Sequence, residues 1–156
     1  MKLSDLYESD ARDTVDEIEV TDGIQAAEEA WAGGVGDFGD PEAAYHVQAM
    51  PGYFAYRSEL EERLREKHGD TLTLYRSITP KKLEDWKNGA DLDPMGFTTS
   101  KKFAESWGNF AGNRGKKMLV IKVDVPVGAI IMRGKAEEHE LVVDANEISA
   151  HTIKVV

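Results

Sequence analysis

The hydrophobic pattern of this chain changes at Gly69, and that change limits the folds it can adopt. Before Gly69 the apolar residues recur at helical spacing, whereas after it they alternate with polar residues or form short runs of Val and Ile. Helices first and strands later favour an α+β fold over an alternating βαβ fold. We therefore predict an acidic helical segment over residues 1–70 and a strand-rich core over 71–156, together forming one compact unit of 156 residues.

Helix start and stop signals divide the first half. Asp40 can cap free backbone amides, and Pro41 follows at a position that needs no amide hydrogen, so a helix is expected to begin there. Glycines at the ends of the apolar patterns should stop helices, because glycine readily adopts the left-handed conformation. The helices expected on these grounds run from Asp22 to Gly33, from Asp40 to about Met50, and through Phe54, Leu60 and Leu64 to Gly69.

Strands and turns dominate the second half. Residues 71–75 alternate apolar and polar side chains, and 118–125 are rich in Val and Ile. Pro126 to Gly128 should form a turn before extended structure resumes over 129–132. Further strands are expected at 141–143 and 153–156, with a short helix between Pro80 and Gly89.

Acidic residues are concentrated in the first half, and the formal net charge of the chain is −10. Residues 1–70 carry 18 acidic and 6 basic side chains, against 11 acidic and 13 basic side chains in 71–156. General affinity for nucleic acid is not expected, because neutralising phosphates requires an excess of Lys and Arg. The acidic half is interpreted as a solvated surface, or alternatively as a segment that contacts a basic partner or partly guards a site in the other half.

Membrane and secretion signals are not apparent in the sequence. No apolar run approaches the roughly 20 residues that span a bilayer, and the N-terminal residues lack the apolar stretch of a secretory signal. The chain has no cysteine, which excludes disulfides and thiolate metal sites. A cytoplasmic location is expected.

Three short segments of the second half carry chemistry. Arg76 lies at the end of an expected strand, three hydroxyl residues follow Gly96-Phe97, and Glu138-His139-Glu140 precedes an apolar run. Each has an ordinary structural explanation by itself. The arginine would pair with a surface carboxylate, the hydroxyls would cap a helix, and the glutamates would form a solvated turn.

Taken in order, the segments resemble the mono-ADP-ribosyltransferases of the Arg–Ser–Glu class, which include bacterial toxins and phage enzymes. The residues between them fit the same resemblance, which covers roughly 70–156: Leu83, Trp86, Gly89, Ala104, Trp107, Pro126 and Gly128. The resemblance implies a split β-sandwich, in which two small packed sheets enclose an NAD cleft and the N-terminal helices pack at one side.

The resemblance also assigns the catalytic residues. Cleavage of the nicotinamide–ribose bond of NAD leaves a ribosyl cation, which a fixed carboxylate stabilises, and Glu140 takes this role. Glu138 would position or deprotonate the acceptor, and alternation along a strand would turn both carboxylates to the same face. Thr98 stands where the family most often has serine, and its hydroxyl would brace Glu140.

Binding of NAD is assigned in the same way. Arg76 would hold a phosphate through forked hydrogen bonds. Thr99 and Ser100 would shape the pocket, Phe110 would stack on nicotinamide, and Arg114 would bind phosphate. No metal is expected, because the four histidines show no ligand spacing and strand alternation would turn His139 away from both glutamates.

The function implied is transfer of ADP-ribose from NAD to a protein, with release of nicotinamide. A glutamate in the Glu138 position accompanies arginine acceptors in the family, so the expected partner is a target protein with a reactive arginine. If a phage or bacterium delivers the chain, it would act in the host cytoplasm. The alternatives are an NAD glycohydrolase at the same site, a catalytically idle binding or structural module, and transfer onto nucleic acid, which the acidic balance disfavours.

Overall fold

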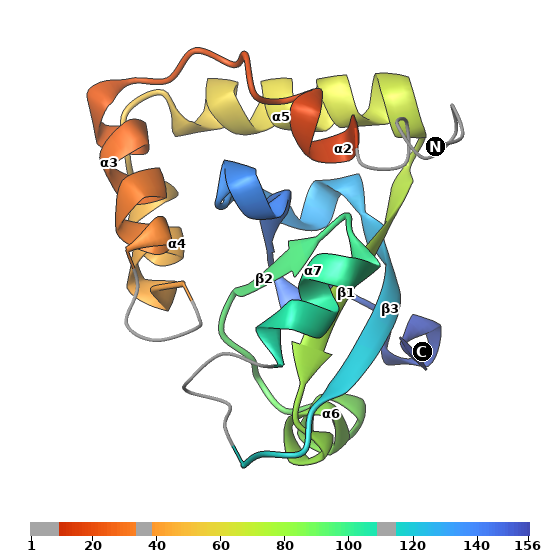
Figure 1. The fold of residues 1–156 in the computed structure, drawn as a ribbon. Helices are drawn as coiled ribbons and strands as arrows, with labels where there is room; N and C mark the ends of the chain where they lie inside the picture. Colours follow the sequence, from red (N-terminus) through yellow and green to blue (C-terminus); the bar gives the residue numbers. More distant parts are fainter. Residues whose placement is uncertain (1–9, 34–38, 109–114) are drawn as a thin grey trace.

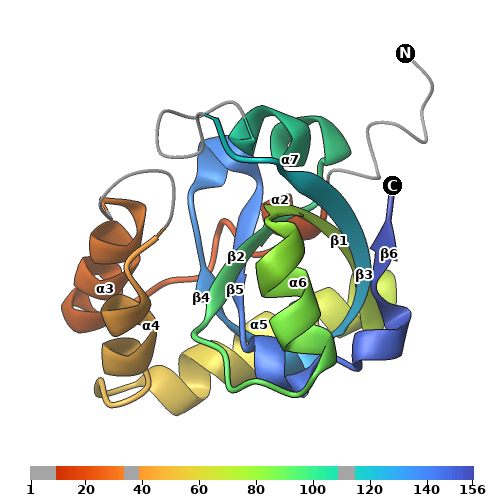
Figure 2. The ribbon, with the colours of Figure 1, turned by 90° about the horizontal axis from the view of Figure 1, so that it is seen from below.

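The computed structural model describes residues 10–33, 39–108 and 115–156 and has an α+β architecture (Figures 1 and 2). The N-terminal helices are α2 (Asp10–Asp13), α3 (Asp22–Ala32), α4 (Pro41–Val47) and α5 (Tyr53–His68). Strands and shorter helices follow in the order β1 (Thr71–Ile78), α6 (Pro80–Lys87), β2 (Met95–Thr98), α7 (Lys101–Trp107), β3 (Leu119–Pro126), β4 (Ile130–Arg133), β5 (Glu140–Val143) and β6 (Lys154–Val155). Single 3₁₀ turns lie at Val127–Ala129, Ala136–Glu138, Ala145–Glu147 and Ala150–Thr152.

Local signals start and stop the helices where the sequence predicts. The Asp40 side chain accepts a hydrogen bond from the Glu42 amide at the start of α4. Gly69, with φ of 83°, ends α5 in the positive-φ region that glycine tolerates. The apolar stripe of α5 is Tyr56, Leu60 and Leu64, so the prediction that Phe54 belongs to it was wrong, and Phe54 is 86% exposed.

The six strands of the described part of the chain form one antiparallel sheet in the order β4-β5-β2-β1-β3-β6. β1 and β3 pair along their full lengths, from Thr71↔Pro126 to Ile78↔Leu119. By contrast, β1 and β2 meet at a single registered pair, Tyr75↔Thr98. The sheet is therefore two three-stranded halves, β4-β5-β2 and β1-β3-β6, joined at one narrow point.

The prediction of two separate packed sheets differs from this arrangement. One registered pair connects the halves, whereas β2, which is only four residues long, pairs along its whole length with β5. The predicted α+β class is confirmed.

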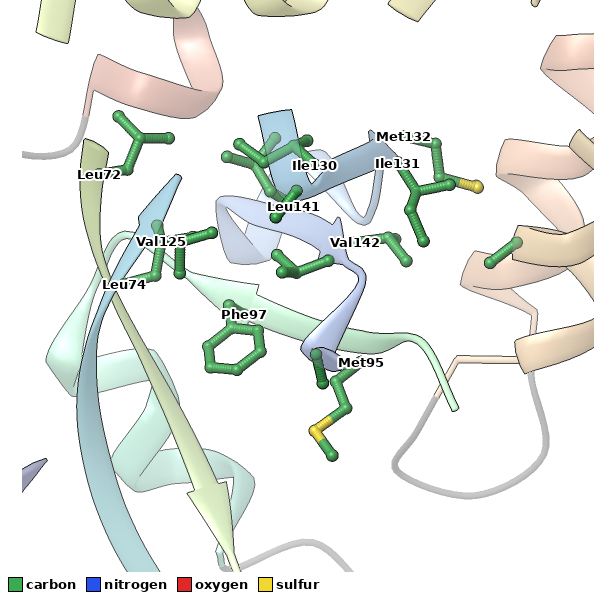
Figure 3. Packing of buried hydrophobic residues seen from close by; sticks show 14 of the residues in the cluster. Leu72, Leu74, Met95, Phe97, Val125, Ile130, Ile131, Met132, Leu141 and Val142 are labelled. Carbon is green, nitrogen blue, oxygen red and sulfur yellow. The ribbon is translucent and has the colours of Figure 1, made fainter. Parts of the chain in front are cut away.

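The hydrophobic core draws side chains from both halves of the sheet. Figure 3 shows Leu72, Leu74 and Val125, from β1 and β3, in one cluster with apolar side chains of β4, β5 and β2. The N-terminal helices contribute to the same cluster through Trp31, Leu60 and Leu64, all 2% exposed or less. Helix α5 packs against β4 and β1, and α7 packs against β1, β2 and β3.

None of the helices in the described part of the chain has the length and apolar character of a membrane span.

Candidate active site

The three sequence segments come together on neighbouring strands. Glu140 begins β5 and pairs in register with Thr98 of β2, and Thr98 in turn pairs with Tyr75 of β1, the residue before Arg76. The arginine, the hydroxyl segment and the glutamate therefore meet at the narrow junction between the two halves of the sheet.

Two donors hold the carboxylate of Glu140. The indole Nε1–H of Trp31 donates to Oε1 at 3.0 Å, and the backbone amide of Lys135 donates to the same oxygen at 2.9 Å. The amide belongs to the turn before β5, whereas Trp31 belongs to the last turn of α3, 109 residues away along the chain. The N-terminal helices thus supply one of the two donors at this carboxylate.

Two glycines make room for the same side chain. A Cβ atom at Gly96 would lie 2.8 Å from Cδ of Glu140, and one at Gly134 would lie 2.6 Å from it. Contacts this short do not occur between real side chains, so the carboxylate fits between β2 and the turn before β5 only because both positions are glycine.

Burial controls the protonation of Glu140, which is 6% exposed. Burial raises the pKa of Glu140 above that of an ordinary glutamate, and the nearby Glu138 charge raises it further. The hydrogen bonds from Lys135 and Trp31 and the charge of Arg76 lower this pKa and partly offset the effect.

Arg76 is buried beside this carboxylate. Its Nη1 donates to the carbonyl oxygen of Gly96 at 2.7 Å, across the point where β1 and β2 diverge. Burial lowers the pKa of Arg76 to about 10, and the Glu140 charge partly opposes that effect. The guanidinium therefore stays charged at neutral pH and places a positive charge next to Glu140.

A pocket of about 130 Å³ opens beside Arg76. Both strands at the junction line it, together with the start of α6 and residues of the N-terminal helices: Trp31, Gly39, Pro41, Arg76, Ser77, Ile78, Thr79, Lys82, Asp93, Pro94, Met95, Gly96 and Met118. Burial and the neighbouring charge of Arg76 lower the pKa of Lys82. Two cationic side chains, Arg76 and Lys82, and the carboxylate of Asp93 are therefore among the described residues that line this small pocket.

The structure corrects the predicted geometry of Glu138. This residue ends the 3₁₀ turn Ala136–Glu138, and His139 has φ of 52°, so the strand begins only at Glu140. Strand alternation consequently does not apply to Glu138 and His139. The His139 ring lies against Phe103, with 5.5 Å between the ring centres.

Glu138 has partners of its own. Trp107 Nε1 donates to Glu138 Oε1 at 3.1 Å, and Lys135 Nζ lies 3.9 Å from Oε2. The Glu138 side chain is 16% exposed, so it is nearer to solvent than Glu140.

The predicted role of Thr98 was wrong in its detail. Its hydroxyl donates to the backbone carbonyl of Glu138 at 2.7 Å, and not to the Glu140 carboxylate. Thr98 lies opposite Glu140 in the ladder, but its side chain reaches the turn that precedes the strand. It therefore braces the polypeptide before Glu140.

The other predicted binding residues are placed differently. Ser100 caps α7 by accepting from the Phe103 amide, as its ordinary structural explanation requires. Thr99 is 8% exposed, and no hydrogen-bond partner for its hydroxyl is found among the described residues. Neither residue lines the pocket beside Arg76. Phe110 and Arg114 lie outside the described residues.

Sequence reasoning did not assign a site role to Trp31, Lys82 or Trp107. A buried tryptophan needs an acceptor for its N–H, so the two indoles could have been expected to find polar partners. Nothing local in the sequence, however, indicates which acceptor each would find.

Comparison with protein-family models, curated proteins and solved structures finds no match to this chain.

Within residues 10–33, 39–108 and 115–156, no group of three or more His, Asp and Glu side chains is arranged to hold a metal ion. The site contains a buried carboxylate, a second carboxylate nearer to solvent, and a buried guanidinium.

Proposed function

We propose that this protein is an NAD-dependent mono-ADP-ribosyltransferase that modifies an arginine of a target protein and releases nicotinamide. The observation that carries the proposal is the position of Arg76, Thr98 and Glu140 on three adjacent strands, at the junction of the two halves of the sheet. These are the residues on which the sequence resembles the Arg–Ser–Glu transferases. The narrow junction also supports a split sandwich, because the halves share only one registered pair.

Glu140 is suited to stabilise a ribosyl cation. In the proposed reaction the bond between C1′ of the ribose and the nicotinamide nitrogen breaks, and its electron pair leaves with nicotinamide. Positive charge then develops on the ribose, and a buried carboxylate held by the backbone amide of Lys135 stabilises it. Ionised Glu140 is the required form, which its partners at Oε1 and the charge of Arg76 favour.

Glu138 is suited to act on the acceptor. A guanidine nitrogen of the target arginine forms the new bond to C1′, and its proton passes to a base. Glu138 lies in the turn that precedes Glu140. Its carboxylate is partly exposed, and the hydrogen bond from Trp107 orients it. It is therefore assigned as the base that takes this proton.

Arg76 and Lys82 are suited to bind the diphosphate of NAD. Both line the pocket beside Arg76, and their charges complement a phosphate group. At about 130 Å³ the pocket is smaller than the roughly 300–1,000 Å³ of typical ligand sites. It would take one part of the dinucleotide, with the remainder lying outside it.

The test is incubation of the protein with NAD and a small guanidine such as agmatine, with both nicotinamide release and ADP-ribosylated guanidine measured. We expect both products from the unmodified protein and a loss of rate of about a hundredfold to a thousandfold in Glu140→Gln. Nicotinamide without the guanidine product would indicate a glycohydrolase. A folded protein that gives neither product with agmatine or with a cell lysate would overturn the proposal.

A further inference from the structure

Trp31 lies between the pocket beside Arg76 and the carboxylate of Glu140. Its side chain lines the pocket, and its Nε1–H donates to Glu140 Oε1 at 3.0 Å. Trp31 is 2% exposed and Glu140 is 6% exposed, and Glu140 is not among the residues that line the pocket. A molecule held by Arg76 in this pocket is therefore separated from Glu140 by the indole.

The indole also occupies the hydrogen-bonding position that a substrate needs. In the proposed reaction the ribose must lie against the Glu140 carboxylate for its developing charge to be stabilised. Its Oε1 is taken by Trp31 and by the Lys135 amide, and its other oxygen packs against Gly96. A ribose cannot reach Oε1 while the indole remains in place.

Packing on the opposite side holds the indole where it is. A Cβ atom at Gly39 would overlap the Trp31 ring, so the backbone at Gly39 lies directly on it. Trp31 is in the last turn of α3, and α3 and α4 form a pair beside the sheet (Figures 1 and 2). The indole therefore belongs to the helical pair, whereas Arg76 and Glu140 belong to the strands.

We propose that Trp31 is an internal plug of the ribose site, an autoinhibitory contact that the substrate must displace from Glu140. The inference rests on the proposed function. It gives the acidic N-terminal half a definite role, which is to keep the carboxylate covered until NAD is bound. In a protein with closed and open states, the apparent affinity for a ligand is reduced by the fraction of molecules that are open.

Removing the plug should therefore strengthen NAD binding. We expect Trp31→Ala to lower the Kd by about tenfold or more, because both the hydrogen bond and the bulk of the indole are lost. Trp31→Phe loses the N–H but keeps most of the bulk, so a smaller decrease is expected. Trp86→Phe is the matched control, because Trp86 is also buried but packs edge-on against Phe97. The Kd of this variant for NAD should equal that of the unmodified protein.

The measurement is calorimetry with a carbocyclic NAD analogue, in which a methylene group replaces the ring oxygen of the nicotinamide ribose so that the bond is not cleaved. In parallel, the three indole N–H signals are recorded by NMR and identified through the single Phe variants. We expect the Trp31 signal of the unmodified protein to shift on saturation and its hydrogen exchange to accelerate. Because it uses the unmodified protein, this NMR measurement tests the displacement of Trp31 even if Trp31→Ala does not fold.

The possible outcomes separate the plug from the proposed function. Equal or weaker analogue binding by the Trp31 variants, or a Trp31 signal that the analogue leaves unchanged, would overturn the plug while nicotinamide release still supported the enzyme. No analogue binding and no nicotinamide release by any of the folded proteins would overturn the proposed function, and the plug with it.

Discussion

Arg133 and Glu28 form a two-point ion pair, with Nε 2.7 Å from Oε2 and Nη2 2.9 Å from Oε1. The pair joins β4 to α3, and Nη1 of the same arginine donates to three backbone carbonyls near the N-terminus, those of Val15, Asp16 and Ile18. Arg133 directly precedes Gly134, whose carbonyl accepts a hydrogen bond from Arg12 at 3.1 Å. The turn that holds Glu140 is thus fixed to the N-terminal half through two arginines.

Breaking this pair should destabilise the whole protein. Glu28→Ala leaves the buried Arg133 charge without its carboxylate, and we expect the free energy of unfolding to fall by about 3–5 kcal/mol. Urea denaturation measures the change. Glu29→Ala, at the exposed neighbouring position of α3, should change it by no more than about 0.5 kcal/mol. Equal effects of the two substitutions would show that the ion pair does not stabilise the fold.

The glycines around Glu140 should tolerate no side chain. Gly96→Ala and Gly134→Ala would each force the carboxylate out of position, so we expect a loss of about 1–3 kcal/mol in stability and the loss of nicotinamide release. Gly128→Ala is the control, because the nearest atom to its added Cβ is Glu61 Oε1 at 3.6 Å, an ordinary contact. Full activity in Gly96→Ala would contradict the close packing described for this site.

The raised pKa of Glu140 predicts a particular dependence of stability on pH. A carboxyl group whose pKa is higher in the folded state binds its proton more tightly there, so its contribution destabilises the fold as pH rises above the unfolded-state value. Glu140→Gln should therefore match the unmodified protein near pH 4 and become relatively more stable as pH rises. Each unit of pKa elevation contributes about 1.4 kcal/mol to the difference. Urea denaturation at pH 4 to 8 measures it, and a constant difference would argue against a raised pKa.

Activity should respond to the same group in the opposite sense. Ionised Glu140 is required, so nicotinamide release should increase with pH through the raised pKa. Glu138→Gln removes a neighbouring charge that raises this pKa, so the acidic limb of the kcat profile should move to lower pH. If the acidic limb of the profile stayed at the same pH in that variant, the charge of Glu138 would not affect the pKa of Glu140.

Lys82 should contribute to NAD affinity through its charge. Lys82→Ala is expected to weaken binding by about tenfold or more, in line with the loss of one hydrogen bond to a charged group. Lys81 precedes it on α6, has a side chain that is 82% exposed, and pairs with Asp85, so Lys81→Ala should leave the Kd unchanged. Calorimetry with the carbocyclic analogue distinguishes the two. Similar effects of both variants would indicate that NAD is attracted by the positive charge of α6 in general and not by Lys82 in particular.

Glu138 and Trp107 should act on transfer more than on hydrolysis. Glu138→Gln is expected to slow transfer to agmatine by about a hundredfold or more while much of the slow hydrolysis of NAD persists. Trp107→Phe removes the hydrogen bond that orients Glu138, so it should shift the ratio of the products in the same direction by a smaller factor. If both products fell equally in Glu138→Gln, the assignment of Glu138 to the acceptor would be wrong.

Local chemistry made much of this fold predictable from sequence. Asp40 with Pro41 specifies the start of α4, and Gly69 specifies the end of α5. Val and Ile between residues 119 and 125 specify β3. In each case the structure of a segment depends on the residues of that segment, so the local sequence is sufficient to predict it.

The geometry around the two glutamates was not predictable in this way. Alternation predicted that Glu138 and Glu140 share a strand face, but a 3₁₀ turn and the positive φ of His139 place Glu138 outside the strand. The Thr98 hydroxyl was expected at Glu140 and reaches the carbonyl of Glu138 instead. The positive φ of His139 changes the direction of the chain at Glu138, and hydrophobic periodicity carries no information about such a turn.

The sequence by itself determined the order of most helices and strands, although not β2, and it identified Arg76, Thr98 and Glu140, which fall on adjacent strands. Only the tertiary structure decided that Trp31 covers Glu140 and that Arg133 ties the site to the N-terminal half. Residues more than 100 positions apart make these contacts, and burial, not a local pattern, selects the partners. A buried indole N–H or guanidinium must find an acceptor, and which acceptor is within reach depends on how the whole chain packs.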